Sequence, residues 1–241
     1  MKNIFLTALF LLPVSIPGII YADLPAGAVY LDGGESKIAV ILAHGRGKNP
    51  RWKVVDPLRI AVNTSLGYHT LSLQMPNANK YWLRYADDFL EAYKIIDTAI
   101  RYLKDEKGVT TIYLMGHSMG SRMMSAYVAH HPDQPLSGLI IAGCRNGGGP
   151  PLSCMGNIEH VNIPVLDIWG DDSDKDSFAA KDRRIFISDR YQQKRIPGAN
   201  HRFEGYEKEF VTAVISWLKT RNNDHGVASV SMDEVSVHPA R

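Results

Sequence analysis

The sequence lacks the features of a nucleic-acid-binding or metal-binding protein. Its 27 Lys and Arg residues nearly balance 25 Asp and Glu residues, and no basic cluster is interleaved with aromatic side chains. Nucleic-acid binding therefore has little support. Only two cysteines are present, without nearby His or Asp partners, and two thiolates fall short of the four ligands that a structural metal site needs. We expect neither a metal nor a cofactor.

A long uninterrupted hydrophobic run is also missing. The apolar stretch near the start follows Lys2 and is broken by Pro13 and Pro17, which leaves it too short for a membrane span. A basic start, an apolar stretch and a small residue at Ala22 are typical of a secretory signal peptide. We expect residues 1–22 to be cleaved, the protein to be exported to the periplasm or secreted, and no stable membrane span to remain.

Both cysteines, Cys144 and Cys154, lie in one loop rich in glycine and proline. In an exported protein such a pair can close a short disulfide bond, the alternative being two free thiols.

The remaining sequence alternates between strand and helix patterns. Apolar runs indicate strands, and apolar residues at helical spacing indicate helices between them. The strands are expected at 37–43, 68–76, 110–115, 136–144, 163–170 and 191–198, and the helices at 52–66, 85–104, after Ser118 and at 203–221. This order predicts one α/β domain, residues 23–221, with a mostly parallel twisted sheet and helices on both faces. Residues 222–241 are polar and aperiodic, and we expect a disordered tail.

A serine stands where one of these strands must become a helix. The segment Gly116-His117-Ser118-Met119-Gly120 follows the apolar run at 110–115 and precedes a helical pattern. A tight strand-to-helix turn needs small residues two positions away on each side, and it raises the hydroxyl above the sheet edge at a helix N-terminus. Because that context accompanies the G-x-S-x-G pattern, we expect Ser118 to be a nucleophile.

A serine nucleophile needs a base, and nine histidines are present. His201 differs from the others because "IPGANHRFEG" puts it between the last strand and the last helix, at the sheet edge that carries Ser118. The chain order Ser, Asp, His also agrees with this role.

The acid that orients the base is less well defined. It should follow the strand "VLDIWG", where Asp171, Asp172, Asp174 and Asp176 are all available, while Asp167 lies inside the strand. Asp174 is our choice, narrowly over Asp172.

Backbone N–H groups should stabilise the negative charge that develops on a substrate oxygen. The residue after the nucleophile, Met119, supplies one of them. The loop "HGRG" after the strand at 37–43 supplies the second, and Arg46 is its expected donor. Together these residues would form an oxyanion hole.

The motifs "LAHGRG", "GHSMG", the acidic loop after "VLDIWG" and "GANH" resemble the α/β-hydrolase superfamily over residues 29–221. More narrowly, "HGRG", "LSLQMP", "VLDIWG" and "IPGANHRF" resemble a group of exported bacterial α/β-hydrolase-like proteins of unknown function. The superfamily resemblance implies the α/β-hydrolase fold and a Ser-His-Asp mechanism, with the position of the acid left open.

The expected reaction is hydrolysis of a small acyl substrate, an ester or thioester, through an acyl-enzyme. A non-catalytic binding protein and an acyltransferase of the same fold are the alternatives. The segment 144–162 has too little apolar periodicity for a helical lid, so we expect an open cleft with a minimal cap or none.

Overall fold

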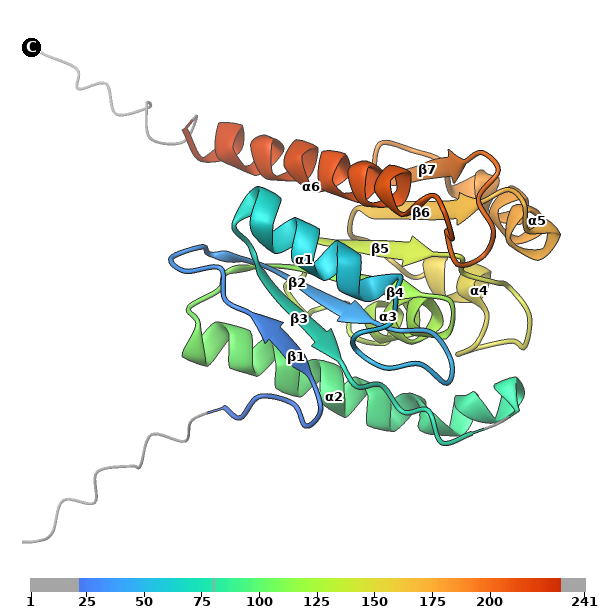
Figure 1. Ribbon diagram of the computed structural model, residues 1–241, viewed down its shortest axis with the longest axis horizontal. Helices are drawn as coiled ribbons and strands as arrows, with labels where there is room; N and C mark the ends of the chain where they lie inside the picture. The colour runs from blue at the N-terminus through green and yellow to red at the C-terminus, as the bar shows by residue number, and fades with distance from the viewer. Residues whose placement is uncertain (1–21, 80, 231–241) are drawn as a thin grey trace, which may run out of the picture.

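One twisted sheet organises the part of the chain that the computed structural model describes, residues 22–79 and 81–230 (Figure 1). Its seven strands lie in the order β1-β3-β2-β4-β5-β6-β7. The pairs from β3 to β7 are parallel, and β1 is antiparallel to β3. The strands are β1 (Val29–Leu31), β2 (Ile38–Ala43), β3 (His69–Leu73), β4 (Thr111–His117), β5 (Gly138–Ala142), β6 (Val165–Gly170) and β7 (Tyr191–Ile196).

Helices cover both faces of this sheet, as the alternating sequence pattern predicts. The α-helices are α1 (Val55–Leu66), α2 (Phe89–Arg101), α3 (Met119–His130), α4 (Cys154–Ile158), α5 (Asp174–Asp182) and α6 (Glu207–Val230). Three shorter elements are the 3-10 helix η1 (Trp82–Asp88), the π-helical turn η2 (Tyr102–Glu106) and the 3-10 helix η3 (Arg183–Phe186). In Figure 1, α1 and α6 lie side by side on one face.

The central strands divide their side chains between two hydrophobic cores. Along β2, Val40 and Leu42 face the core formed with α1 and α6, whereas Ile41 faces the core formed with α2 and α3. Successive side chains of a strand point to opposite faces, so a strand buried on both faces reads as a continuous apolar run. This explains why "IAVILA" is apolar throughout.

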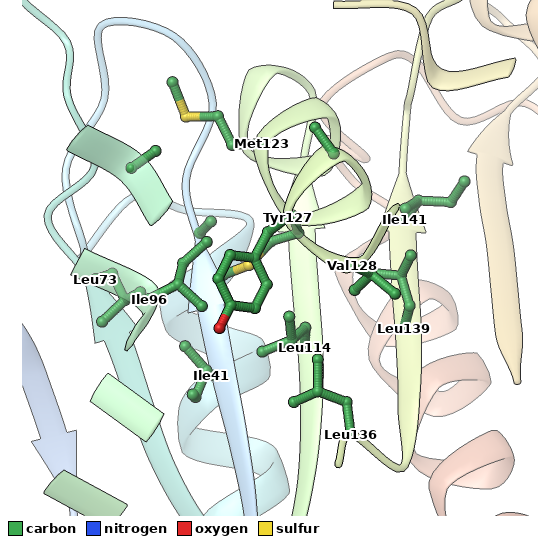
Figure 2. Packing of buried hydrophobic residues seen from close by; sticks show 14 of the residues in the cluster. Ile41, Leu73, Ile96, Leu114, Met123, Tyr127, Val128, Leu136, Leu139 and Ile141 are labelled. Carbon is green, nitrogen blue, oxygen red and sulfur yellow. The ribbon is translucent and has the colours of Figure 1, made fainter. Parts of the chain in front are cut away.

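Helix α3 packs closely on the sheet in the second of these cores. Figure 2 shows Tyr127 near Ile96 of α2 and Leu114 of β4, and Val128 near Leu139 of β5. The Tyr127 hydroxyl donates to Asp97 of α2 at 2.6 Å, so the one polar atom of this ring is satisfied. The helix that begins at the predicted nucleophile is therefore fixed to the sheet below it.

The α/β-hydrolase fold is confirmed, and several expected boundaries are corrected. Strand β1 and helices α4 and α5 were not anticipated, and residues 85–88 are 3-10 helix rather than α-helix. Helix α6 extends to Val230, into the segment 222–241 for which a disordered tail is predicted, and 231–241 lie outside the described residues. The predicted signal peptide, residues 1–22, also lies outside them except for Ala22.

Candidate active site

Ser118 stands at the turn between β4 and α3 in a strained backbone conformation. Its φ is 55° and its ψ is −113°, and among the described residues only Phe203 is another non-glycine residue with positive φ. A conformation of this kind costs about 1–3 kcal/mol and persists only where the surrounding structure imposes it. The predicted elbow geometry is present.

The two flanking glycines are needed because backbone approaches both of them closely. A Cβ on Gly116 would lie 2.4 Å from the carbonyl group of Gly120, and a Cβ on Gly120 would lie 2.4 Å from the Ala43 carbonyl oxygen at the end of β2. Real Cβ atoms do not approach other atoms this closely. Gly116 therefore lets α3 begin directly above β4, and Gly120 lets it pass β2.

Hydrogen bonds from the neighbouring strand hold the turn. The Ser118 backbone N–H donates to the Ala142 carbonyl at the end of β5, at 2.8 Å. The buried hydroxyl of Ser121 accepts from Ala142 N at 3.0 Å and donates to the Gly116 carbonyl at 2.5 Å. Sequence reasoning missed Ser121, because a serine in the first turn of a helix carries no signal of such a contact.

Ser118, His201 and Asp176 form a chain of hydrogen bonds. The Ser118 Oγ and His201 Nε2 are 3.0 Å apart, and His201 Nδ1 is 2.5 Å from Asp176 Oδ2. His201 comes from the loop between β7 and α6, as predicted. The carboxylate is not the predicted one, because Asp176 rather than Asp174 contacts His201.

The position of α5 explains this correction. Asp174 is the first residue of that helix and is exposed, whereas Asp176 is 1% exposed. Two residues along a helix correspond to a rotation of about 200°, so the two side chains lie on opposite faces. The acidic segment, expected as a loop, is a helix whose inner face carries Asp176.

The other acids have different partners or none near His201. Asp171, after β6, accepts from Gly198 N at 2.6 Å and so joins the loops after β6 and β7. Asp167 lies inside β6, as the sequence indicated, and pairs with buried Arg183 at 2.9 Å rather than with His201. Asp172 is exposed.

Arg145 holds the second oxygen of the Asp176 carboxylate. Its Nε donates to Asp176 Oδ1 at 2.7 Å, while Oδ2 faces His201. Burial alone would raise the pKa of Asp176, but the hydrogen bonds and charges of His201 and Arg145 outweigh it, so the pKa lies below its usual value. Asp176 is therefore ionised at neutral pH and oriented from both sides.

A second histidine supports the first. His117, the last residue of β4, is fully buried and donates from Nε2 to the His201 carbonyl oxygen at 2.9 Å. Burial, reinforced by His201, lowers the pKa of His117 to about 3, so it stays neutral. Gly143 provides the room beside the imidazole, because a Cβ there would lie 3.0 Å from His201 Nδ1.

The two residues predicted to donate backbone N–H groups, Arg46 and Met119, line one cleft together with Ser118. The Met119 N–H is the first of α3, where intrahelical acceptors are absent. His44 fixes the other loop, because its Nδ1 donates to the Gly45 carbonyl and its Nε2 accepts from Met75 N at 3.1 Å. Burial lowers the pKa of His44, which keeps that Nε2 available as an acceptor.

The strained Ser118 thus follows the central strand β4 and is hydrogen-bonded to His201, which follows the last strand, β7. In agreement with this geometry, a family model of the alpha/beta hydrolase fold matches residues 38–159. The chain belongs to the α/β-hydrolase fold family.

Solved structures of other α/β hydrolases are similar to this chain. A dienelactone hydrolase from Anabaena variabilis is 17% identical over 83% of this chain and 95% of its own, with a TM-score of 0.68. An alpha-beta serine hydrolase homologue from Coxiella burnetii is 20% identical over 86% and 99%, with a TM-score of 0.66. At this identity the likeness establishes the fold. A search of curated proteins found no match.

A third similar structure, XC6422 from Xanthomonas campestris, is described as a serine hydrolase without lid. It is 18% identical over 84% of both chains, with a TM-score of 0.56. In the present α/β hydrolase, the segment between β5 and β6 holds only the five-residue α4, whose Cys154 and Ile158 are buried in the core with α3. The minimal cap expected from the sequence is therefore observed.

The cleft beside Ser118 has a volume of about 600 Å³. Trp82 of η1, Phe178 of α5 and the segment Gly143–Gly147 contribute to its walls. A larger hollow of about 790 Å³ lies between β7 and α6, and Ser118, His201 and Asp176 are not among the residues that line it. The volume of the smaller cleft is that of a small-molecule site.

The segment that follows Gly143 is closed by the predicted disulfide bond. Cys144 and Cys154 are bonded, with their Cα atoms 6.0 Å apart. Within the described ranges, no cluster of His, Cys, Asp or Glu side chains is arranged to hold a metal ion, and no helix has the length and apolar character to cross a membrane.

Proposed function

We propose that this α/β hydrolase is a serine hydrolase that cleaves ester or thioester bonds through an acyl-enzyme. The observation that carries the proposal is the hydrogen-bonded chain from Ser118 Oγ through His201 to Asp176. Each group in it has the position its chemistry requires: a nucleophile, a base within reach of its proton, and a buried carboxylate that orients the base.

The reaction has two halves. His201 Nε2 takes the Ser118 proton as Oγ attacks the substrate carbonyl, and the N–H groups of Met119 and Arg46 stabilise the negative oxygen. The bond to the leaving group then breaks, and His201 returns the proton to that group. Water repeats the sequence on the acyl-enzyme, releasing the acid and free Ser118.

Asp176 keeps His201 in the tautomer that this scheme needs. A carboxylate acceptor at Nδ1 requires the proton on Nδ1, which leaves Nε2 free to accept from Ser118. The ionised state of Asp176, supported by Arg145, also stabilises the imidazolium that forms in each half.

Covalent labelling tests the proposal. A fluorophosphonate should label the wild-type protein on Ser118, and the Ser118→Ala protein should not be labelled. Ser216→Ala, which removes a hydroxyl from α6, should be labelled as fast as wild type. A folded wild-type protein that never reacts would favour the non-catalytic binding protein, and transfer to an added alcohol in preference to water would favour the acyltransferase.

The base is tested separately. His201→Ala should lower kcat/KM for an activated ester on the order of 10³-fold or more while the protein stays folded. His160→Ala, at an exposed position, is the matched control. Near-normal hydrolysis by His201→Ala would overturn the assignment of the base.

We also propose that the protein is exported. The support is the disulfide bond between Cys144 and Cys154, which persists in oxidising compartments, together with the composition of residues 1–22. Fractionation of cells that express the chain with and without residues 1–22 tests this: only the former should yield a shortened protein outside the cytoplasm.

A further inference from the structure

A buried arginine lies one helical turn beyond the nucleophile. Arg122 of α3 is only 6% exposed, yet it lines the cleft that contains Ser118. Its Nη1 donates to the carbonyls of Gly147 and Leu152 at 2.7 and 2.8 Å. Its guanidinium carbon lies 5.2 Å from the centre of a Trp82 ring, which lines the same cleft.

No carboxylate among the described side chains balances the positive charge of Arg122. Among the side chains that the structure describes, in residues 22–79 and 81–223, no carboxylate pairs with it, and its Nε and Nη2 have no protein acceptor. Burial, together with Arg145 and Arg183, lowers the pKa of Arg122 to about 10. A buried cation of this kind is costly unless an anion joins it.

The rest of the cleft adds positive charge. Lys175 of α5 and Arg145 line it together with Arg122, while Asp182 is the one acid among the lining residues of the described chain. Arg145 is already engaged by Asp176, but Lys175 has no carboxylate partner in that part of the chain. The lining residues also include Trp82 and Phe178, whose rings suit a short hydrocarbon segment.

We propose that the cleft takes esters or thioesters that carry a carboxylate, which Arg122 and Lys175 bind while the acyl carbonyl lies at Ser118. This inference rests on the proposed hydrolase function and narrows its substrate class. A planar guanidinium with Nε and Nη2 available matches the two oxygens of a carboxylate, and such charge-assisted hydrogen bonds are stronger than neutral ones. Arg122 and Lys175 are thus specificity-determining residues, distinct from those that perform the chemistry.

Matched substrates test the inference without changing size. Mono-4-nitrophenyl glutarate is compared with 4-nitrophenyl 4-carbamoylbutanoate, where an amide replaces the carboxylate in the acyl part. The pair 4-carboxyphenyl acetate and 4-carbamoylphenyl acetate makes the same comparison in the leaving group. For at least one pair, kcat/KM should be about tenfold or more higher for the carboxylate. A difference below twofold in both pairs would overturn the inference.

Variants identify the residues responsible. Lys175→Met should lower the preference several-fold and Arg122→Met should abolish it, where the preference is the ratio of kcat/KM for the carboxylate ester to kcat/KM for the neutral ester, measured on the same variant. Lys208→Met, on the exposed surface of α6, removes the same charge elsewhere and should leave the preference unchanged. Arg122 also holds Gly147 and Leu152 in place, so the folding of Arg122→Met is checked first. If Arg122→Met does not fold, Lys175→Met and the salt dependence of the wild-type preference decide. High salt should weaken the preference. A preference that is unchanged both in Lys175→Met and at high salt would overturn the inference.

A binding measurement separates this inference from the hydrolase proposal. Titration of the Ser118→Ala protein with monomethyl glutarate and with methyl 4-carbamoylbutanoate needs no turnover. If wild type hydrolyses none of the esters but Ser118→Ala binds the carboxylate compound selectively, the proposed function fails and the anionic site stands. If the two compounds bind equally and the carboxylate and amide esters are hydrolysed equally, the inference of an anionic site is overturned, whether or not the protein is a hydrolase.

Discussion

Replacing Asp176 by asparagine is the sharpest test of the proposed mechanism. The carboxylate accepts from His201 Nδ1 with one oxygen and from Arg145 Nε with the other. An asparagine offers one oxygen and one NH₂ group, so it can satisfy only one of these two donors. If the NH₂ faces His201, the imidazole must carry its proton on Nε2, where it can no longer accept from Ser118. If it faces Arg145, two donors oppose each other in a buried position.

The expected loss follows from this geometry. In serine proteases the same replacement lowers kcat about 10⁴-fold because the histidine adopts the wrong tautomer. We expect a decrease of about 10³- to 10⁴-fold in kcat for Asp176→Asn. If the NH₂ faces Arg145, the buried donors left without an acceptor should also lower the free energy of unfolding by about 1–3 kcal/mol.

Asp174→Asn is the matched control, because it makes the same chemical change two residues earlier in α5. Its side chain is exposed at the first position of the helix, where a carboxylate contributes about 0.3–1 kcal/mol through the helix dipole. Its kcat should stay within about twofold of wild type. Both variants are assayed with an activated ester, with thermal unfolding measured in parallel. A crippled Asp174→Asn beside an active Asp176→Asn would refute the reasoning.

Three further changes probe the support of the site. Gly143→Ala should lower kcat at least tenfold, because the new Cβ would lie 3.0 Å from His201 Nδ1. His117 has a folded-state pKa of about 3 and an unfolded value of about 6.5, so the unfolded state binds more protons between them and stability falls as pH falls. His117→Gln should remove a slope of about 1.4 kcal/mol per pH unit between pH 6 and 4, measured by denaturant unfolding. Replacing both Cys144 and Cys154 by alanine should cost about 3 kcal/mol of stability in the chain-entropy model and should alter substrate preference, because the loop walls the cleft.

Each of these changes has a control. Gly34→Ala places a side chain at a similar positive φ of 61° with no atom within 4 Å, so it should cost stability without lowering kcat. His160→Gln changes an exposed histidine and should leave the acid slope intact. Unchanged substrate preference in the cysteine-free protein would show that the loop keeps its position without the bond.

Local patterns in the sequence sufficed for several parts of the site. Ser118 was found because a strand-to-helix turn needs glycine on both sides, and the contacts of Gly116 and Gly120 with nearby backbone show the reason. His201 was found because the carboxyl ends of parallel strands meet at one edge of the sheet. In both cases the decisive information lies within a few residues of the chain.

Residues whose role depends on contacts between distant elements were missed. Arg145 touches Asp176 across 31 positions of the chain, and Arg122 reaches Leu152 across 30. No feature of the neighbouring sequence distinguishes Arg122 or Arg145 from other charged residues. Gly143 was the exception, since its place directly after β5 is a signal that could have been used.

The sequence by itself determined the α/β class, the turn at Ser118 and the loop that carries His201, because these follow from the periodicity and turn chemistry of short segments. Only the tertiary structure decided between Asp174 and Asp176, since that choice depends on which face of α5 is turned toward the sheet edge. It likewise decided that Arg122 lies in the cleft without a carboxylate partner among the described residues. Charge balance in a buried site depends on which distant side chains fold together, and no local pattern encodes that.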